Sequence, residues 1–203
     1  LVGSEMCIRD RLRTLPVTGG PAVAGIFPAL EEMLTDRGPA LLPVPADDPA
    51  RTRILVDSQR PGEPIDDRVA LVVSTSGSTG TPKGAMLSAA ALAASAAATD
   101  TVLGGPGRWL LALPAHHIAG LQVILRSLRA GHEPVVVDVT RGFDPETLPT
   151  AVDAWRAGTG AGSGRAADRA YTSLVPGQLA KVLDEGSPAA VDALAALDAV
   201  LLG

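Results

Sequence analysis

Residues 74–84 have the sequence Ser74-Thr75-Ser76-Gly77-Ser78-Thr79-Gly80-Thr81-Pro82-Lys83-Gly84. The segments on either side of this stretch show which kind of fold contains it. An apolar, β-branched run precedes it at 69–73, and an alanine-rich segment that opens at Ser88 follows it. This order predicts a buried strand, a glycine-rich loop and, soon afterwards, a helix. Glycines let the backbone approach a ligand closely, and successive N–H groups of such a loop can bind an anion. The stretch therefore predicts a site for phosphate groups.

The hydroxyls and the single cation of this stretch suit phosphate binding. Serine and threonine hydroxyls donate to phosphate oxygens, and Lys83 adds a compact positive charge. The chain strongly prefers arginine, and Lys83 and Lys181 are its two lysines. A mobile surface loop with a solvated lysine is the alternative, but flexible linkers do not usually follow directly on a buried-strand pattern.

Several other nucleotide and catalytic motifs are excluded by single residues. A Walker A loop ends in Gly-Lys-Ser/Thr, whereas Pro82 precedes Lys83 here and Gly84 follows it. The dinucleotide fingerprint Gly-x-Gly-x-x-Gly is absent from the stretch. A short-chain dehydrogenase would need Tyr-x-x-x-Lys, but Val175 stands four places after Tyr171. The chain also lacks the Gly-x-Ser-x-Gly elbow of hydrolases.

The stretch resembles the phosphate loop of the acyl-adenylate-forming ligases at essentially every position. That family uses ATP to convert a carboxylic acid into an acyl-AMP, and many members then transfer the acyl group to coenzyme A. The resemblance implies that the loop grips the β- and γ-phosphates of ATP while Mg2+ shares their charge. It assigns Lys83 a catalytic role on the leaving pyrophosphate and implies no metal site built from protein ligands. The implied nucleotide-binding residues are Thr75, Ser76, Gly77, Ser78, Thr79, Gly80 and Lys83.

Composition narrows the class of protein. Apolar residues make up 46% of the 203 residues, which favours a globular fold over disorder. The net charge of −5 and an aromatic content of 2% argue against a nucleic-acid partner. The single cysteine, Cys7, fits a reducing compartment. No segment reaches the ~20 apolar residues of a membrane span, so we expect a cytoplasmic protein without an integral membrane segment, and a homo-oligomer is left open.

Strand and helix patterns alternate along the chain, which predicts an α/β fold with a mostly parallel sheet and helices on both faces. The resemblance makes this part of the large N-terminal domain of an adenylate-forming ligase. No linker divides the chain, and 39–49 is predicted as a loop because it carries four prolines. The predicted strands are 53–57, 69–73, 109–113, 134–139, 171–175 and 197–202, and the predicted helices are 21–34, 88–98, 117–129, 145–155, 176–183 and 189–196.

Both ends of the sequence suggest a fragment. Residues 1–11 show no periodicity and resemble a translated sequencing adapter, so we expect a non-native or disordered leader. Residues 12–203 would then be a partial AMP-binding domain that stops before the adenine loop. The resemblance implies that a small C-terminal domain with a catalytic lysine is absent, so we expect the piece alone to be inactive.

A second motif follows the strand at 109–113. Leu113-Pro114-Ala115-His116-His117-Ile118-Ala119-Gly120 resembles the ligases' Leu-Pro-x-Phe-His-x-x-Gly, with His116 at the usual aromatic position. The resemblance implies that His117 lines the acyl pocket and gates the entry of the thiol. Ligands of parallel sheets bind beyond the carboxyl ends of strands. We therefore expect His117 and the phosphate loop to face one cavity at one edge of a single sheet.

A third segment, 171–179, resembles one branch of the family, the 2-succinylbenzoate–CoA ligases of menaquinone biosynthesis. The residues concerned are Tyr171-Thr172-Ser173-Leu174-Val175-Pro176 with Gln178-Leu179, whereas Gly177 departs from the pattern. The resemblance implies 2-succinylbenzoate as the acid and Ser173 as a substrate-binding residue. Ser173 equally fits a buried strand serine that is bonded to backbone. The open alternatives are a ligase for a fatty or aryl acid, an amino-acid-adenylating domain, and a non-catalytic nucleotide-binding module.

Overall fold

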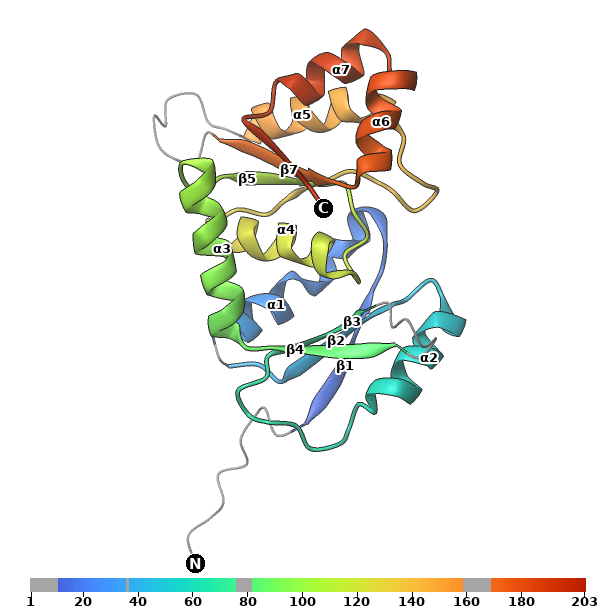
Figure 1. Ribbon diagram of the computed structural model, residues 1–203, viewed down its shortest axis with the longest axis vertical. Helices are drawn as coiled ribbons and strands as arrows, with labels where there is room; N and C mark the ends of the chain where they lie inside the picture. Colours follow the sequence, from blue (N-terminus) through green and yellow to red (C-terminus); the bar gives the residue numbers. More distant parts are fainter. Residues whose placement is uncertain (1–10, 36, 76–81, 159–168) are drawn as a thin grey trace, which may run out of the picture. The chain divides into compact units, whose positions relative to one another are not determined.

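The described residues of the computed structural model are 11–35, 37–75, 82–158 and 169–203. They divide into two compact units, each of which contains one four-stranded sheet (Figure 1). The described part of the first unit comprises 11–18, 23–35, 37–75 and 82–95, and that of the second comprises 19–22, 96–158 and 169–203. The prediction of a single sheet is therefore wrong. The phosphate-loop strand lies in one sheet, and the strands before His117 and around Ser173 lie in the other.

The first sheet has the strand order β1-β2-β3-β4. Its strands are β1 (Leu12–Val17), β2 (Ala40–Pro45), β3 (Leu71–Thr75) and β4 (Lys83–Leu87). The pairs β1/β2 and β2/β3 are parallel, whereas β3 and β4 are antiparallel. The predicted helix therefore does not directly follow the phosphate loop, because β4 intervenes.

Strand β2 replaces the loop that was predicted at 39–49, although it contains Pro43 and Pro45. A proline cannot donate to a ladder, so prolines normally stay at sheet edges. The register explains the exception. β2 pairs with β3 at Leu41↔Leu71 alone, while all of β2 pairs with β1. Beyond Leu41 the strand has one hydrogen-bonded neighbour and behaves as an edge, so both prolines are tolerated.

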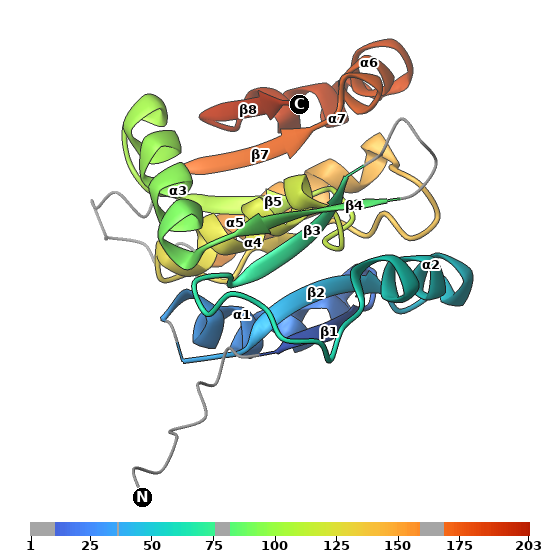
Figure 2. The same cartoon turned by 60° about the horizontal axis from the view of Figure 1, so that its bottom comes forward.

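Helix α2 (Pro49–Gln59) lies where a strand was predicted at 53–57, so that prediction is wrong (Figure 2). The Asp48 side chain accepts a hydrogen bond from the backbone N–H of Arg51, and Pro49 occupies the first helical turn. Both features start helices. Within the apolar run that suggested a strand, Leu55 is buried and joins the core formed by Leu12, Ala40, Leu42, Val44, Val69 and Val72.

Three further helical elements complete this part of the chain. Residues predicted as one helix at 21–34 form a 3-10 helix, η1 (Gly20–Ile26), and then α1 (Phe27–Leu34). Helix α3 (Ala89–Leu103) begins in the first unit and ends in the second. Its predicted N-cap is confirmed, because the Ser88 hydroxyl accepts from the Ala91 N–H at 3.1 Å.

The second sheet is entirely parallel, with the order β6-β5-β7-β8. Helix α4 covers one face, and α5 and α7 cover the other (Figure 1). The predicted parallel sheet with helices on both faces is confirmed here. The strands are β5 (Arg108–Leu111), β6 (Val135–Val136), β7 (Ala170–Leu174) and β8 (Ala199–Leu202), and the helices are α4 (Ile118–Arg129), η2 (Pro145–Thr147), α5 (Leu148–Gly158), α6 (Pro176–Glu185) and α7 (Pro188–Ala195).

Side chains from both faces of this sheet are fully buried. Leu110 and Leu174 contribute to an aliphatic core with Val152 of α5. On the face toward α4, the rings of Trp109 and Tyr171 lie 5.2 Å apart, centroid to centroid. Packing on both faces therefore holds β5 and β7 in place. The segments that follow these two strands carry the histidine motif and the segment around Ser173.

Candidate nucleotide and acid site

The phosphate stretch joins the two antiparallel strands β3 and β4. Thr75, the last residue of β3, pairs with Lys83, the first residue of β4. The Thr75 hydroxyl also donates to the Lys83 carbonyl at 3.2 Å, while both side chains are exposed. The sheet therefore places a hydroxyl and a cation side by side at one strand end. The predicted ligands Ser76, Gly77, Ser78, Thr79 and Gly80 lie outside the described residues, and their roles stay predictions.

The backbone on both sides of Lys83 is held by Gln59, the last residue of α2. The Gln59 amide nitrogen donates to the Pro82 carbonyl at 3.0 Å. Gly84 lies directly against the Gln59 amide oxygen, and a Cβ built at Gly84 would meet this oxygen and lie 2.8 Å from a methyl carbon of Val72. A side chain at position 84 would therefore displace the Gln59 amide and press on Val72. No pattern in the sequence indicated that Gln59 belongs to this site.

The histidine motif forms the entry to helix α4. His117 is the N-cap residue with an extended backbone, its N–H donates to the Pro114 carbonyl at 3.2 Å, and its side chain is exposed. The rings of His116 and His117 lie 4.2 Å apart. A Cβ at Gly120 would lie 2.5 Å from the Pro114 carbonyl oxygen. The motif's glycine thus lets the helix fold back onto the strand end, which fixes His117.

The ends of β5 and β7 meet, as expected for parallel neighbours. Gln178 joins them, because its amide nitrogen donates to the Ala112 carbonyl at 2.8 Å and its amide oxygen accepts from the Val175 N–H at 3.0 Å. The residue Ser173 is 8% exposed, and its hydroxyl donates to the Leu201 carbonyl at 3.4 Å. This geometry fits the alternative reading of Ser173 as a buried strand serine bonded to backbone. Gln178 is the third residue of α6, with Pro176 as the first, and a Gln at this position is a signal in the sequence for the start of a helix.

Two polar side chains, the half-buried Arg126 and the buried Tyr171, lie near the first residues of β5 and β7. The Arg126 guanidinium lies 5.2 Å from the centroid of Trp109, and burial lowers its pKa, while the nearby Asp100 charge acts in the opposite direction. Burial also raises the pKa of Tyr171, whose hydroxyl lies 3.1 Å from the Leu103 carbonyl and 3.0 Å from that of Gly105. These contacts attach the C-terminal end of α3 to the second sheet.

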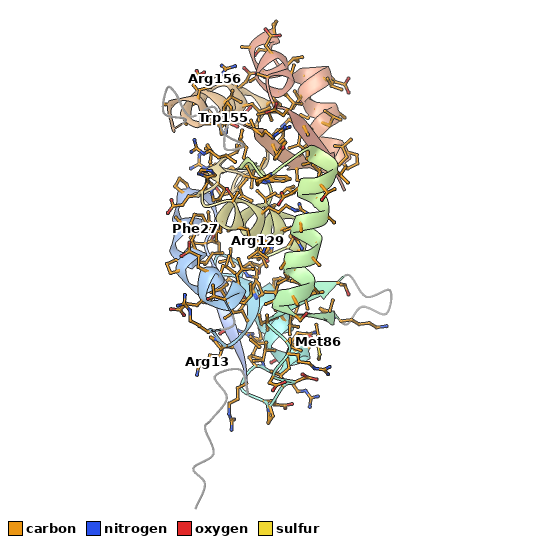
Figure 3. The ribbon with its side chains drawn as sticks, turned by 90° about the vertical axis from the view of Figure 1, so that its left-hand side faces the viewer. Arg13, Phe27, Met86, Arg129, Trp155 and Arg156 are labelled. Atoms are coloured by element: carbon orange, nitrogen blue, oxygen red, sulfur yellow. The ribbon has the colours of Figure 1, made fainter. Side chains whose placement is uncertain are left out.

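Two cavities lie near the described elements. One of about 220 Å³ adjoins Gln59, Arg60, Glu63 and the exposed Met86 of β4 (Figure 3). The other, of about 250 Å³, is lined by α5 and α7, and Arg156 of α5 contributes to it. Among the described residues, no group of three or more His, Cys, Asp or Glu side chains is arranged to hold a metal ion. In the same part of the chain, no helix has the length and apolarity to cross a membrane.

Comparison with known proteins identifies the family. The sequence profile described as "AMP-binding enzyme" matches residues 22–203. The chain belongs to the AMP-binding enzymes. The match covers the second sheet and strands β2 to β4 of the first, so the hairpin at Lys83 and the helix entry at His117 both lie within the region that identifies the family.

Relatives of this AMP-binding enzyme include two proteins that are named as 2-succinylbenzoate–CoA ligases, one of them as a probable one. The chain is 53% identical over 192 residues to the "Probable 2-succinylbenzoate--CoA ligase" of Mycobacterium tuberculosis. The aligned region covers 95% of this chain and 46% of that protein. The chain is 38% identical over 84 residues to the 2-succinylbenzoate–CoA ligase of Bacillus licheniformis, covering 40% and 17% of the two chains. This chain thus spans less than half the length of the curated relatives that it matches.

A solved structure shares the fold. The O-succinylbenzoate coenzyme A synthetase of Bacillus subtilis in complex with AMP matches with a TM-score of 0.68 and 19% identity, over 97% of this chain and 56% of that one. At this identity the match concerns the fold. It confirms the predicted fold class, an α/β fold with mostly parallel strands and helices.

Proposed function

We propose that this chain is the N-terminal part of a 2-succinylbenzoate–CoA ligase of menaquinone biosynthesis. The observation that carries the proposal is the 53% identity over 192 residues to the Mycobacterium tuberculosis relative of that name. The segment around Ser173 and the histidine motif support the same branch. The longer protein that would contain this chain is called the complete ligase below.

The proposed reaction has two steps. A carboxylate oxygen of the acid bonds to the α-phosphorus of ATP, and the bond from that phosphorus to pyrophosphate breaks. The sulfur of coenzyme A then bonds to the acyl carbon, AMP leaves, and the thiol proton passes to solvent. In such steps an enzyme acts mainly by positioning groups and stabilising charge.

The residues of the chain divide between the two substrates. Lys83 would stabilise the negative charge on the leaving pyrophosphate, together with the loop at 76–80. Its exposure at the end of a paired strand, beside the Thr75 hydroxyl, fits a group that must reach phosphate oxygens. Mg2+ would bind with ATP, mainly through phosphate oxygens, and neutralise part of their charge. His117 and Ser173 would bind the acid, with His117 also gating entry of the thiol.

The test is acid-dependent exchange of pyrophosphate into ATP by the complete ligase. Lys83→Ala should lower the exchange rate by more than tenfold, which corresponds to at least ~1.4 kcal/mol of barrier. Lys181→Ala is the matched control, because Lys181 is the chain's other lysine and lies in α6 of the second unit, outside the Lys83 hairpin. Its ammonium donates to the Phe143 carbonyl. Equal rates for the two variants would overturn the role of Lys83.

Substrate identity is tested with a panel of acids. We expect 2-succinylbenzoate to support exchange and CoA ester formation better than fatty, aryl or amino acids. A different preferred acid would overturn the branch assignment, and no exchange with any acid would favour a non-catalytic nucleotide-binding module. We also propose that the 203-residue chain alone does not turn over, and acyl-CoA formation by this chain would refute that.

A further inference from the structure

Gln59 occupies a fixed position at the end of a helix. It is the last residue of α2, and Arg60 follows in the left-handed conformation at φ 48°. The Arg60 N–H donates to the Val56 carbonyl, which closes the final turn. The Gln59 amide nitrogen also lies 3.1 Å from the Ser58 hydroxyl oxygen, which accepts from it. The amide is therefore oriented by its own helix before it contacts any other element.

From this position the amide contacts both neighbours of Lys83. The amide nitrogen donates to the carbonyl of the buried Pro82, and Gly84 lies against the amide oxygen. On the opposite side, the Thr75 hydroxyl donates to the Lys83 carbonyl. The backbone of Lys83 is thus held by Gln59 from α2 and by Thr75 from β3, while its side chain is exposed.

We infer that Gln59 is a positioning residue that sets where the Lys83 ammonium meets the phosphates of the nucleotide. The inference rests on the proposed role of Lys83. Gln59 itself would touch neither ATP nor the acid. A displacement of about 1 Å in a catalytic group is enough to lower a rate strongly, so loss of this amide should weaken catalysis without removing any ligand of the substrate.

The primary experiment measures exchange kinetics of Gln59→Ala in the complete ligase. We expect kcat/KM for ATP to fall by about two- to tenfold, the range expected for one neutral hydrogen bond, with KM for the acid unchanged. Asp57→Ala is the control, because Asp57 is an exposed residue of the same helix. The control should change kcat/KM by less than about twofold, as expected of an exposed residue outside the site.

A second variant adds a readout that a purely structural role would not give. Gln59→Glu places a carboxylate opposite the Pro82 carbonyl, and neither group can donate when the carboxylate is ionised. A protonated carboxyl can donate. The activity of Gln59→Glu relative to wild type should therefore recover as the pH falls from 8 toward 5, whereas the relative activity of Gln59→Ala should stay constant.

A third variant measures coupling across the contact. Gly84→Ala should reduce exchange strongly, because the added methyl group collides with the Gln59 amide and Val72. If the two residues act together, Gln59→Ala should add less loss in the Gly84→Ala background than alone. Full additivity of the two losses would count against the inference.

The outcomes separate this inference from the proposed function. Exchange is followed with whichever acid the wild-type enzyme uses, so a failure of 2-succinylbenzoate overturns the acid assignment and leaves the Gln59 test intact. The inference is overturned if Gln59→Ala matches Asp57→Ala, or if it lowers the melting temperature and weakens acid and ATP saturation equally. A selective loss toward ATP with an unchanged melting temperature supports it.

Discussion

Gly120→Ala tests the account of the histidine motif most directly. The added Cβ would lie 2.5 Å from the Pro114 carbonyl oxygen, 2.8 Å from its carbon and 2.9 Å from the Leu113 carbonyl oxygen. All three neighbours are backbone atoms, so no flexible side chain can turn away. Helix α4 or the strand end must shift instead. Forcing extra volume into a packed site costs about 1–3 kcal/mol, and backbone contacts on this scale favour the upper half of that range.

The same substitution has an opposing, favourable effect. Replacing glycine by alanine inside a helix stabilises it by about 0.5–1 kcal/mol. The net destabilisation expected for Gly120→Ala is therefore about 1–2.5 kcal/mol. With a urea m-value of about 2 kcal/mol per M, the unfolding midpoint should fall by about 0.5–1.3 M.

Gly177→Ala is the matched control for this prediction. Gly177 also lies in the first turn of a helix, α6, but nothing lies within 4 Å of a Cβ built there. It should raise the midpoint slightly or leave it unchanged. The measurement is urea unfolding of both variants beside the wild type, followed by circular dichroism. A midpoint for Gly120→Ala equal to or above that of Gly177→Ala would refute the close-approach argument.

Two further predictions concern hydrogen bonds at other positions. Gln178→Ala removes the hydrogen bonds to Ala112 and Val175, so it should lower the free energy of unfolding by about 1–2 kcal/mol. The same urea series measures this change, and an unchanged midpoint would contradict the proposed link between the ends of β5 and β7. The pKa of Asp66 lies below its ordinary 3.8, mainly because of the hydrogen bond from the Arg68 side chain. Since the folded pKa is depressed, the stabilisation by this ion pair is fully present above the ordinary pKa of 3.8 and is lost as the pH falls from there through the lower folded pKa. NMR titration should therefore show the Asp66 carboxyl protonating below the ordinary range, and Arg68→Ala should raise its pKa; no change in that variant would be the contrary result.

The second half of the fold could be predicted from the sequence because its two central strands, β5 and β7, are buried on both faces. Continuous apolar runs there matched β5, β7 and β8, and the helix that starts at His117 was predicted to within one residue. The local pattern and the tertiary environment agree in this region. Strand β6 is shorter than predicted, with Val135–Val136 in place of 134–139.

The first half was harder because tertiary pairing overrides local preference. The prolines of β2 argued for a loop, and only the register with β1 and β3 explains why a strand tolerates them. The apolar run at 54–56 suggested a strand, although the Asp48-Pro49 start signal for α2 stood just before it. The partition into two sheets depends on long-range pairing that no sequence window contains.

The candidate site shows the same division. The motif containing Lys83 and the motif containing His117 were visible because their residues are contiguous in sequence. Gln59 precedes its partner Pro82 by 23 residues and lies in a segment that was predicted to be a strand. Its contact with the Lys83 region depends on how α2 ends beside β4, and only the fold supplies that information. Whether His117 faces the loop at 76–81 stays a prediction, because those residues lie outside the described ones.

The pairing of Thr75 with Lys83 has a practical consequence for protein engineering. Segments between antiparallel strands are natural grafting points, because the two stems define a fixed span that a transplanted insert must bridge. Here the stems are defined by Ser74↔Gly84 and Thr75↔Lys83. A segment taken from another enzyme can therefore be inserted between Thr75 and Lys83, while Lys83 keeps its paired position at the start of β4.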